Sequence, residues 1–286
     1  MTSPPGGFKR VVVGLLQSMA NQAAVNAAAD FAEFLNVELL ATFIADASLH
    51  ALAGLPAARE LRILERGWQA IDPAQISRDI DRAEGFARRC FAEAVAARTI
   101  KTSFDIVAGV QAMASRIRAD DIVAVVEPAH PGERITRQFT GLLDAALESA
   151  AAVVILPRRI ARTAGPVIAI AAGPDDGSIR VGLGLAAALR ENLIVVTRLG
   201  VLLPSDIVAE ANALGVRLDK VVADQPFADG SAGRTFASTG KARLRVIARD
   251  RIPGDAAQVF TTLHGIPLLV IEPARIATER QRRNAH

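Results

Sequence analysis

The residues best suited to chemistry lie in segment 125–141, which reads VVEPAHPGERITRQFTG. An apolar run leads there into a polar loop and then into a helical pattern. Many α/β proteins bind phosphate at such a place, because the backbone amides at a helix N-terminus attract an anion. Arg134 and Arg137 could hold an anion by charge, but Pro128 and Pro131 have no N–H group to donate. The segment therefore has the outline of an anion-binding loop from which several parts are missing.

Other catalytic or metal-binding chemistry finds no support in the sequence. It contains no G-x-S-x-G nucleophile motif, no G-x-x-x-x-G-K-[ST] loop and no G-x-G-x-x-G after a strand. The single cysteine, Cys90, lies on an apolar helical face, which indicates a buried, inert thiol. The four histidines are far apart: His50, His130, His264 and His286. We therefore expect no catalytic residue, no metal site and no disulfide within the chain.

The bulk composition indicates a two-domain α/β protein. The chain has 286 residues, 51% of them hydrophobic, but only 4% aromatic and no tyrosine, so its core must consist of small aliphatic side chains. Such a core suits helices packed on parallel strands. The net charge is +3, and part of it lies in the tail 275–286. The sequence has no basic patch with aromatic residues between the basic ones, so we do not expect nucleic acid as a partner. We expect a cytoplasmic protein, without a signal peptide or a membrane span.

Short apolar runs alternate with helical periodicity along the chain, and the pattern occurs twice. The first five strands are expected at 11–16, 38–46, 103–109, 121–127 and 151–157. The next five are expected at 166–173, 192–200, 216–224, 242–250 and 267–273. This duplication predicts two tandem α/β units with parallel sheets. The parts are unit 1 at 8–158, a shorter unit 2 at 166–274, a linker around 158–165 and a basic tail at 275–286.

With this organisation the chain resembles the tandem universal stress proteins. The resemblance rests on VVVGLLQS, on FDIVAGVQAMASRIRADDIVAVVEP and on the closing segments VVILPRR and LLVIEP. It covers nearly the whole chain in two copies. It implies a stress-response protein with two Rossmann-like units, each a five-stranded parallel sheet of order 3-2-1-4-5 with helices on both faces. It also implies that the units pair through their last strands, while a homodimer and an unknown protein partner stay open.

Unit 1 departs from the motif of the nucleotide-binding branch of this family. That branch places an aspartate after the first strand, and it follows the fourth strand with G-x-x-G, nine residues and then G-S or G-T. Here Leu16 stands in place of the aspartate, and Glu127 adds a negative charge after the fourth strand. Eight residues separate Gly132 from Gly141, and Leu142 follows where a hydroxyl is expected. The nucleotide-binding motif is therefore degenerate.

Unit 2 departs further from the family pattern. Residues 173–178 are typical of a turn that leads into a helix capped by Ser178. The connection after the fourth strand is too short for a phosphate loop. Asp250, between Arg249 and Arg251, predicts a local surface ion pair there.

These departures leave two hypotheses about function. The first is a non-catalytic stress-response protein that acts through protein contacts, without strong ATP binding and without a cofactor. The second is a nucleotide- or anion-binding protein, with ATP as cofactor and with weak ATPase activity at most. On the second hypothesis the binding residues are Gly14, Ser18, Gly109, Gly132, Arg134, Arg137 and Gly141.

Two further features require an interpretation. The insertion 47–97 contains the segment 55–62 and Trp68, and it predicts either a lid or partner surface, or an amphipathic helix with Trp68 as a partly buried anchor. The Asp120-Asp121 pair lies where a helix meets a strand, at the edge away from the crevice, and a structural turn is expected there.

Overall fold

A computed structural model describes most of the chain. The described residues are 8–17, 22–55, 57–62, 67–127, 137–157, 162, 164–223, 241–251 and 265–272.

The strands of both units adopt the predicted order. Unit 1 contributes β1 (Arg10–Leu16), β2 (Glu38–Ala45), β5 (Thr102–Ala108), β6 (Asp121–Val126) and β7 (Ala152–Leu156). Unit 2 contributes β8 (Val167–Ile170), β9 (Leu193–Thr197), β10 (Leu218–Val222), β11 (Leu244–Ala248) and β12 (Leu268–Ile271). Within each unit all strand pairs are parallel, in the order β5-β2-β1-β6-β7 and β10-β9-β8-β11-β12. The order 3-2-1-4-5 implied by the family resemblance is confirmed.

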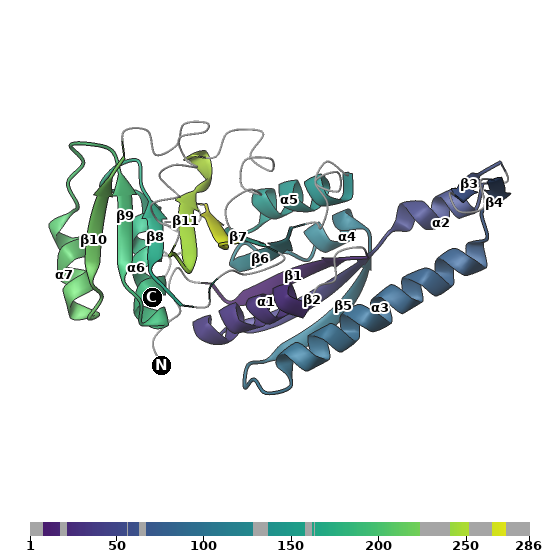
Figure 1. Ribbon diagram of the computed structural model, residues 1–286, viewed down its shortest axis with the longest axis horizontal. Helices are drawn as coiled ribbons and strands as arrows, with labels where there is room; N and C mark the ends of the chain where they lie inside the picture. The colour runs from purple at the N-terminus through teal and green to yellow at the C-terminus, as the bar shows by residue number, and fades with distance from the viewer. Residues whose placement is uncertain are drawn as a thin grey trace.

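The two units join edge to edge through their last strands. β7 and β12 pair antiparallel, with Leu268 opposite Ile155 and Ile271 opposite Ala152, and the described strands form one ten-stranded sheet (Figure 1). The predicted pairing of the units is therefore confirmed. Because this pairing is antiparallel, the strands of unit 1 and those of unit 2 point in opposite directions. The carboxyl ends of one unit therefore lie beside the amino ends of the other.

Helices cover both faces of this sheet, which explains why its central strands consist mostly of apolar residues. One face packs against α1 (Gln22–Leu35), α3 (Pro73–Val95), α6 (Gly177–Leu189) and α7 (Ser205–Ala213). The other face packs against α4 (Val110–Ala114) and α5 (Arg137–Ser149). In β1 the residues alternate between the two cores, with Val11 and Val13 in the first and Val12 in the second.

The insertion of unit 1 forms an arm that extends away from the sheet, at the right of Figure 1. It consists of α2 (Ala47–Ala53) and of β3 (Arg59–Arg62) paired antiparallel with β4 (Gly67–Ala70), and the polypeptide then enters α3. Of the two interpretations of this insertion, the amphipathic helix with Trp68 as a partly buried anchor was wrong. The segment 55–62 contains a short strand where a helix was expected, and Trp68 is 67% exposed on β4. The polar run 59–62 carries one apolar residue, too few to reveal a strand by alternation.

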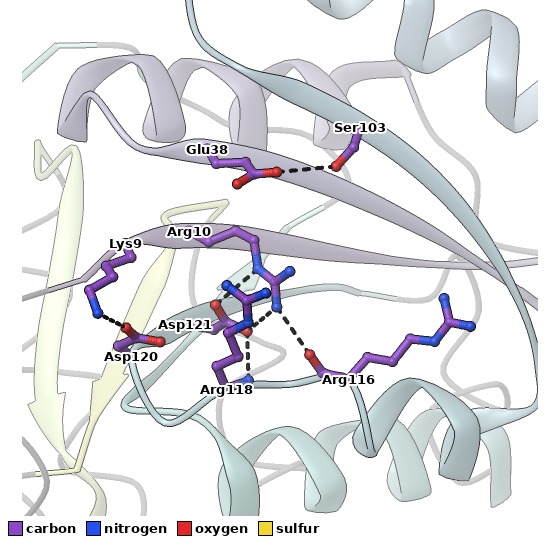
Figure 2. A network of polar contacts seen from close by, with 8 residues as sticks. All are labelled: Lys9, Arg10, Glu38, Ser103, Arg116, Arg118, Asp120 and Asp121. Atoms are coloured by element: carbon purple, nitrogen blue, oxygen red, sulfur yellow. Dashed lines mark hydrogen bonds and ion pairs between the residues drawn. The ribbon is translucent and has the colours of Figure 1, made fainter.

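A buried ion pair fastens the amino ends of β1 and β6, as Figure 2 shows. Arg10 donates from Nε to Oδ1 of Asp121 at 3.0 Å and from Nη2 to Oδ2 at 2.6 Å. Asp121 is fully buried, and its Oδ2 also accepts from the backbone N–H of Arg118 at 2.7 Å. These hydrogen bonds raise the pKa of the Arg10 guanidinium. Asp120, one residue earlier, pairs with the exposed Lys9 at 2.7 Å. The predicted structural role of Asp120-Asp121 is confirmed.

Candidate functional site

The candidate sites are the two crevices at the carboxyl ends of the central strands. In an open parallel sheet a ligand binds where the strand order reverses, between the first and the fourth strand of a unit. In unit 1 that position lies beyond Leu16 of β1 and Val126 of β6, and in unit 2 it lies beyond Ile170 of β8 and Ala248 of β11.

The floor of the unit 1 crevice is apolar at the end of β1. Leu16 is 2% exposed and belongs to the same core cluster as Phe139 and Leu142 of α5. The next residue, Gln17, is half-buried, and its Oε1 atom is buried without a hydrogen bond in the part of the chain that the structure describes. An amide oxygen can accept hydrogen bonds from a ligand, but it cannot neutralise phosphate charge.

Several residues proposed for the second hypothesis cannot be placed. Ser18, Gly132 and Arg134 lie outside the described residues, as does the rest of segment 128–136. Arg137 is the first residue of α5, and its side chain is not described. Gly141 lies in α5, and no described atom comes within 4 Å of the position that a Cβ atom would occupy there. Their role as a group in ligand binding stays a prediction.

Gly14 and Gly109 have structural reasons to be glycine. A Cβ atom on Gly14 would lie 3.2 Å from Cδ2 of Leu142 and 3.2 Å from Cε of Met113, so its absence lets α5 and α4 pack closely on β1. Gly109 precedes α4 with a φ of +87°, a conformation that favours glycine. Its N–H donates to the carbonyl of Ala45 at 2.9 Å. Packing and backbone geometry are sufficient to explain both glycines without a ligand.

Replacement of Gly14 by valine is expected to lower the free energy of unfolding by about 1–3 kcal/mol, because the added methyl groups overpack the contact with α5. Urea unfolding followed by circular dichroism measures this effect. Gly141→Ala is the control, since it fills open space in a helix and should raise stability by about 0.5–1 kcal/mol. A neutral Gly14→Val variant would show that close packing does not require this glycine.

The crevice of unit 2 is open but has carboxylates in its wall. It encloses about 310 Å³ and is lined by the loop after β8 and by the end of β11, including Asp175, Asp176 and Asp250. That volume lies at the lower end of the range for small-molecule sites. These carboxylates are negatively charged, as a phosphate group is, and would repel it.

The amides of this loop bond to a side chain of the protein. Oδ1 of Asp176 accepts from the N–H of Ser178 at 3.0 Å, and Oδ2 accepts from the N–H of Ala172 at 3.0 Å. Asp176 is therefore the N-cap of α6, and the prediction that Ser178 caps this helix was wrong. Ser178 is buried, and its hydroxyl donates to the carbonyl of Ile170 at 3.0 Å. The N-terminus of α6 is thus capped by an aspartate where a ligand anion would have to bind.

The arginine after β11 contacts unit 1, a contact that the sequence did not predict, and the local ion pair expected for Asp250 stays a prediction. Nη1 of Arg249 donates to the carbonyl of Leu147, near the C-terminus of α5. The same atom lies 3.6 Å from Oε2 of Glu272, at the end of β12. A basic side chain near a helix C-terminus is favourable because it complements the helix dipole. Arg249 therefore helps to hold the two units together.

Arg245 is a charged residue that the sequence analysis did not single out. It is the second residue of β11, opposite Ile168 and Leu268 on the neighbouring strands, and is fully buried. Burial lowers the pKa of its guanidinium from the usual 12.5 to about 10. The strand sequence LRVIA shows the arginine, but nothing in the pattern shows that it points into a core. The position is distant from the carboxyl edge of β11, so we assign Arg245 no role in the crevice.

The described residues provide no metal site and no reactive thiol. Within them, no three His, Cys, Asp or Glu side chains gather closely enough to hold a metal ion. Cys90 is buried in α3, and burial raises the pKa of its thiol, so little reactive thiolate forms. The prediction that the Cys90 thiol is buried is confirmed.

Comparison with solved structures agrees with this geometry over nearly the whole chain. A universal stress protein from Archaeoglobus fulgidus DSM 4304 superposes with a TM-score of 0.56 at 11% identity, over 92% of this chain and 96% of that one. A candidate universal stress protein from Pseudomonas aeruginosa UCBPP-PA14 has a TM-score of 0.51 at 16% identity, over 98% and 99% of the two chains. The chain has the tandem universal stress protein fold. No protein-family model matches the sequence, and no curated protein matches it at a significant level.

The universal stress protein fold gives the two crevices equivalent positions in the two units. Val11 of β1 pairs with Ile122 of β6, and Val167 of β8 pairs with Leu244 of β11, and all four residues belong to the same core cluster. Val11 and Val167 therefore hold equivalent positions. Leu16 and Ala172 follow them at the same spacing and are also equivalent, so neither unit has a carboxylate there. Among the helices that the structure describes, none combines the length and the apolar character needed to cross a bilayer.

Proposed function

We propose that this chain is a cytoplasmic member of the universal stress protein family that acts in the stress response through protein contacts, without catalysis and without strong ATP binding. The observation that carries the proposal is the crevice of unit 2, where Asp176 caps α6 and accepts hydrogen bonds from the backbone N–H groups of Ser178 and Ala172. The fold supports the family assignment, and the two crevices support the loss of nucleotide binding.

The electrostatics of the unit 2 crevice argue against a triphosphate. Asp175 and Asp250 line the same cavity as the capping carboxylate. Two like charges about 4 Å apart repel each other by about 4 kcal/mol at the effective dielectric constant of a protein surface. A nucleotide would also have to displace Asp176, which would leave the helix N-terminus without its cap.

The unit 1 crevice supports the proposal in a different way. Leu16 directs an apolar side chain into the core at the position where nucleotide-binding relatives have an aspartate. Pro128 and Pro131 have no N–H group for a phosphate oxygen. Arg134 and Arg137 remain the argument for the alternative, an anion or nucleotide held by the loop after β6.

The nucleotide content of the purified protein tests this proposal. The protein is denatured, and the supernatant is examined by absorbance at about 260 nm, where nucleotide bases absorb, and by mass spectrometry. We expect no stoichiometric nucleotide, because a ligand survives purification only when it binds tightly. A stoichiometric adenine nucleotide would overturn the proposal in favour of the alternative. In that case Arg134→Ala with Arg137→Ala should remove the nucleotide if the loop after β6 holds it.

A further inference from the structure

The arm of unit 1 exposes apolar side chains that the rest of the described chain does not cover. Trp68 is 67% exposed, Leu55 58%, Leu61 52% and Leu52 44%. Leu61 and Trp68 are direct partners across β3 and β4 and therefore lie on the same face of this small sheet. Leu52 and Leu55 are joined by a hydrogen bond from the N–H of Leu55 to the carbonyl of Leu52 at 3.1 Å.

The arm has little core of its own. Its sheet has two strands and is separate from the large sheet, and a two-stranded sheet alone is marginally stable in water. In Figure 1 it lies beyond the end of the large sheet, at the tip formed by α2 and the start of α3. The arm therefore gains stability when another surface covers its apolar face.

The charges near the arm favour a neutral partner. Asp72 pairs with Arg78 at 3.3 Å, and Asp79 pairs with Arg82 at 2.7 Å, so positive and negative groups alternate along the start of α3. Such a surface has no strong field to attract nucleic acid or an anionic membrane. It also does not repel a second copy of itself.

The face that Leu61 and Trp68 share supplies a substantial part of the area that a dimer needs. These two side chains together expose on the order of 250 Å² of apolar surface. A standard interface buries roughly 800 Å² on each partner, of which about 60% is apolar. The Leu61 and Trp68 face of one arm against the same face of an identical arm can therefore supply about half of the apolar part of a standard interface.

We propose that this arm is the homodimerisation surface of the protein, with Leu61 and Trp68 of one copy packed against the same pair of a second copy about a two-fold axis. The proposal rests on the arm alone and does not depend on whether either crevice binds a nucleotide. It assigns the insertion, which unit 2 lacks, to assembly of the whole chain.

Trp68 is the only tryptophan of the chain, so its fluorescence reports this contact directly. The full-length protein is examined from about 0.1 to 100 µM, the range in which a micromolar dimer forms. Analytical ultracentrifugation should show the mass rising from 30.1 kDa to twice that value. The tryptophan emission should shift to shorter wavelength over the same range, because the indole ring leaves water.

A matched pair of variants locates the contact. Leu61→Glu keeps Trp68 and should weaken dimerisation at least tenfold. At low and intermediate protein concentrations the emission of Trp68 in this variant should therefore stay at the long wavelength of an indole ring in water. Leu202→Glu makes the same substitution at a leucine that is 78% exposed outside the arm, and it should dimerise like the unchanged protein. A protein that stays at 30.1 kDa, or a dimer in which the Trp68 emission does not shift, would overturn the proposal. These two outcomes are read on the unchanged protein, so they hold even if Leu61→Glu disturbs the arm.

Discussion

Replacement of Asp121 by alanine is expected to lower the free energy of unfolding by about 3–5 kcal/mol, because it leaves a buried cation without its partner. Arg10 is 8% exposed and would lose both hydrogen bonds to the carboxylate. The backbone N–H of Arg118 would lose its acceptor as well. The contact of Arg10 with the carbonyl of Arg116 at 3.0 Å would remain, but a single neutral acceptor does not compensate a buried charge.

Urea unfolding measures this loss, and the neighbouring residue provides the control. Asp120→Ala removes an ion pair with Lys9, whose side chain is 62% exposed, and should cost less than about 1 kcal/mol. The double variant Arg10→Met with Asp121→Leu removes both charges and should recover most of the stability. Equal losses for Asp121→Ala and Asp120→Ala would show that the buried pair does not fasten β1 to β6.

Gly165→Ala is expected to cost about 3 kcal/mol or more, since both the backbone and the space exclude a side chain. The φ of Gly165 is +130°, and a Cβ atom would lie 2.2 Å from the carbonyl oxygen of Lys241. The obstacle is backbone, so a rotamer change cannot relieve the clash. Gly165 also donates its N–H to Glu191 at 2.9 Å, directly before β8 begins.

Thermal unfolding of this variant should begin in unit 2, because the clash separates the starts of β8 and β11. Arg243 normally donates its N–H to the carbonyl of Pro166 at 3.0 Å, and this bond holds the two strand starts together. Gly173→Ala is the matched control, since no described atom lies within 4 Å of its Cβ position. If both alanine variants unfold at the same temperature, the close approach at Gly165 does not contribute to stability.

The strands and their order could be predicted because they depend on apolar runs and on their repetition. The segment 11–16 and the segment 122–126 contain no polar side chain, as expected of strands in a sheet whose two faces are covered by helices. The arm could not be predicted in the same way. Its strands are four residues long, and β3 reads RELR, in which only Leu61 is apolar.

The location of the crevices also followed from the sequence, but the details of unit 2 did not. Both Asp176 and Ser178 are residue types that cap helices. What decides between them is the carbonyl of Ile170, which binds the Ser178 hydroxyl and leaves Asp176 to accept from the loop amides. Likewise, Arg249 reaches Leu147 only because the two units meet at β7 and β12. Such contacts between distant segments have no local signal in the sequence.

A calorimetric titration of ATP into the full-length chain tests whether both crevices have lost strong nucleotide binding. We predict no saturable heat at ATP concentrations up to about 1 mM, which corresponds to a binding free energy weaker than about −4 kcal/mol. Saturable binding of ATP with a micromolar Kd would contradict the account, and the number of sites would show whether one unit or both had retained the activity.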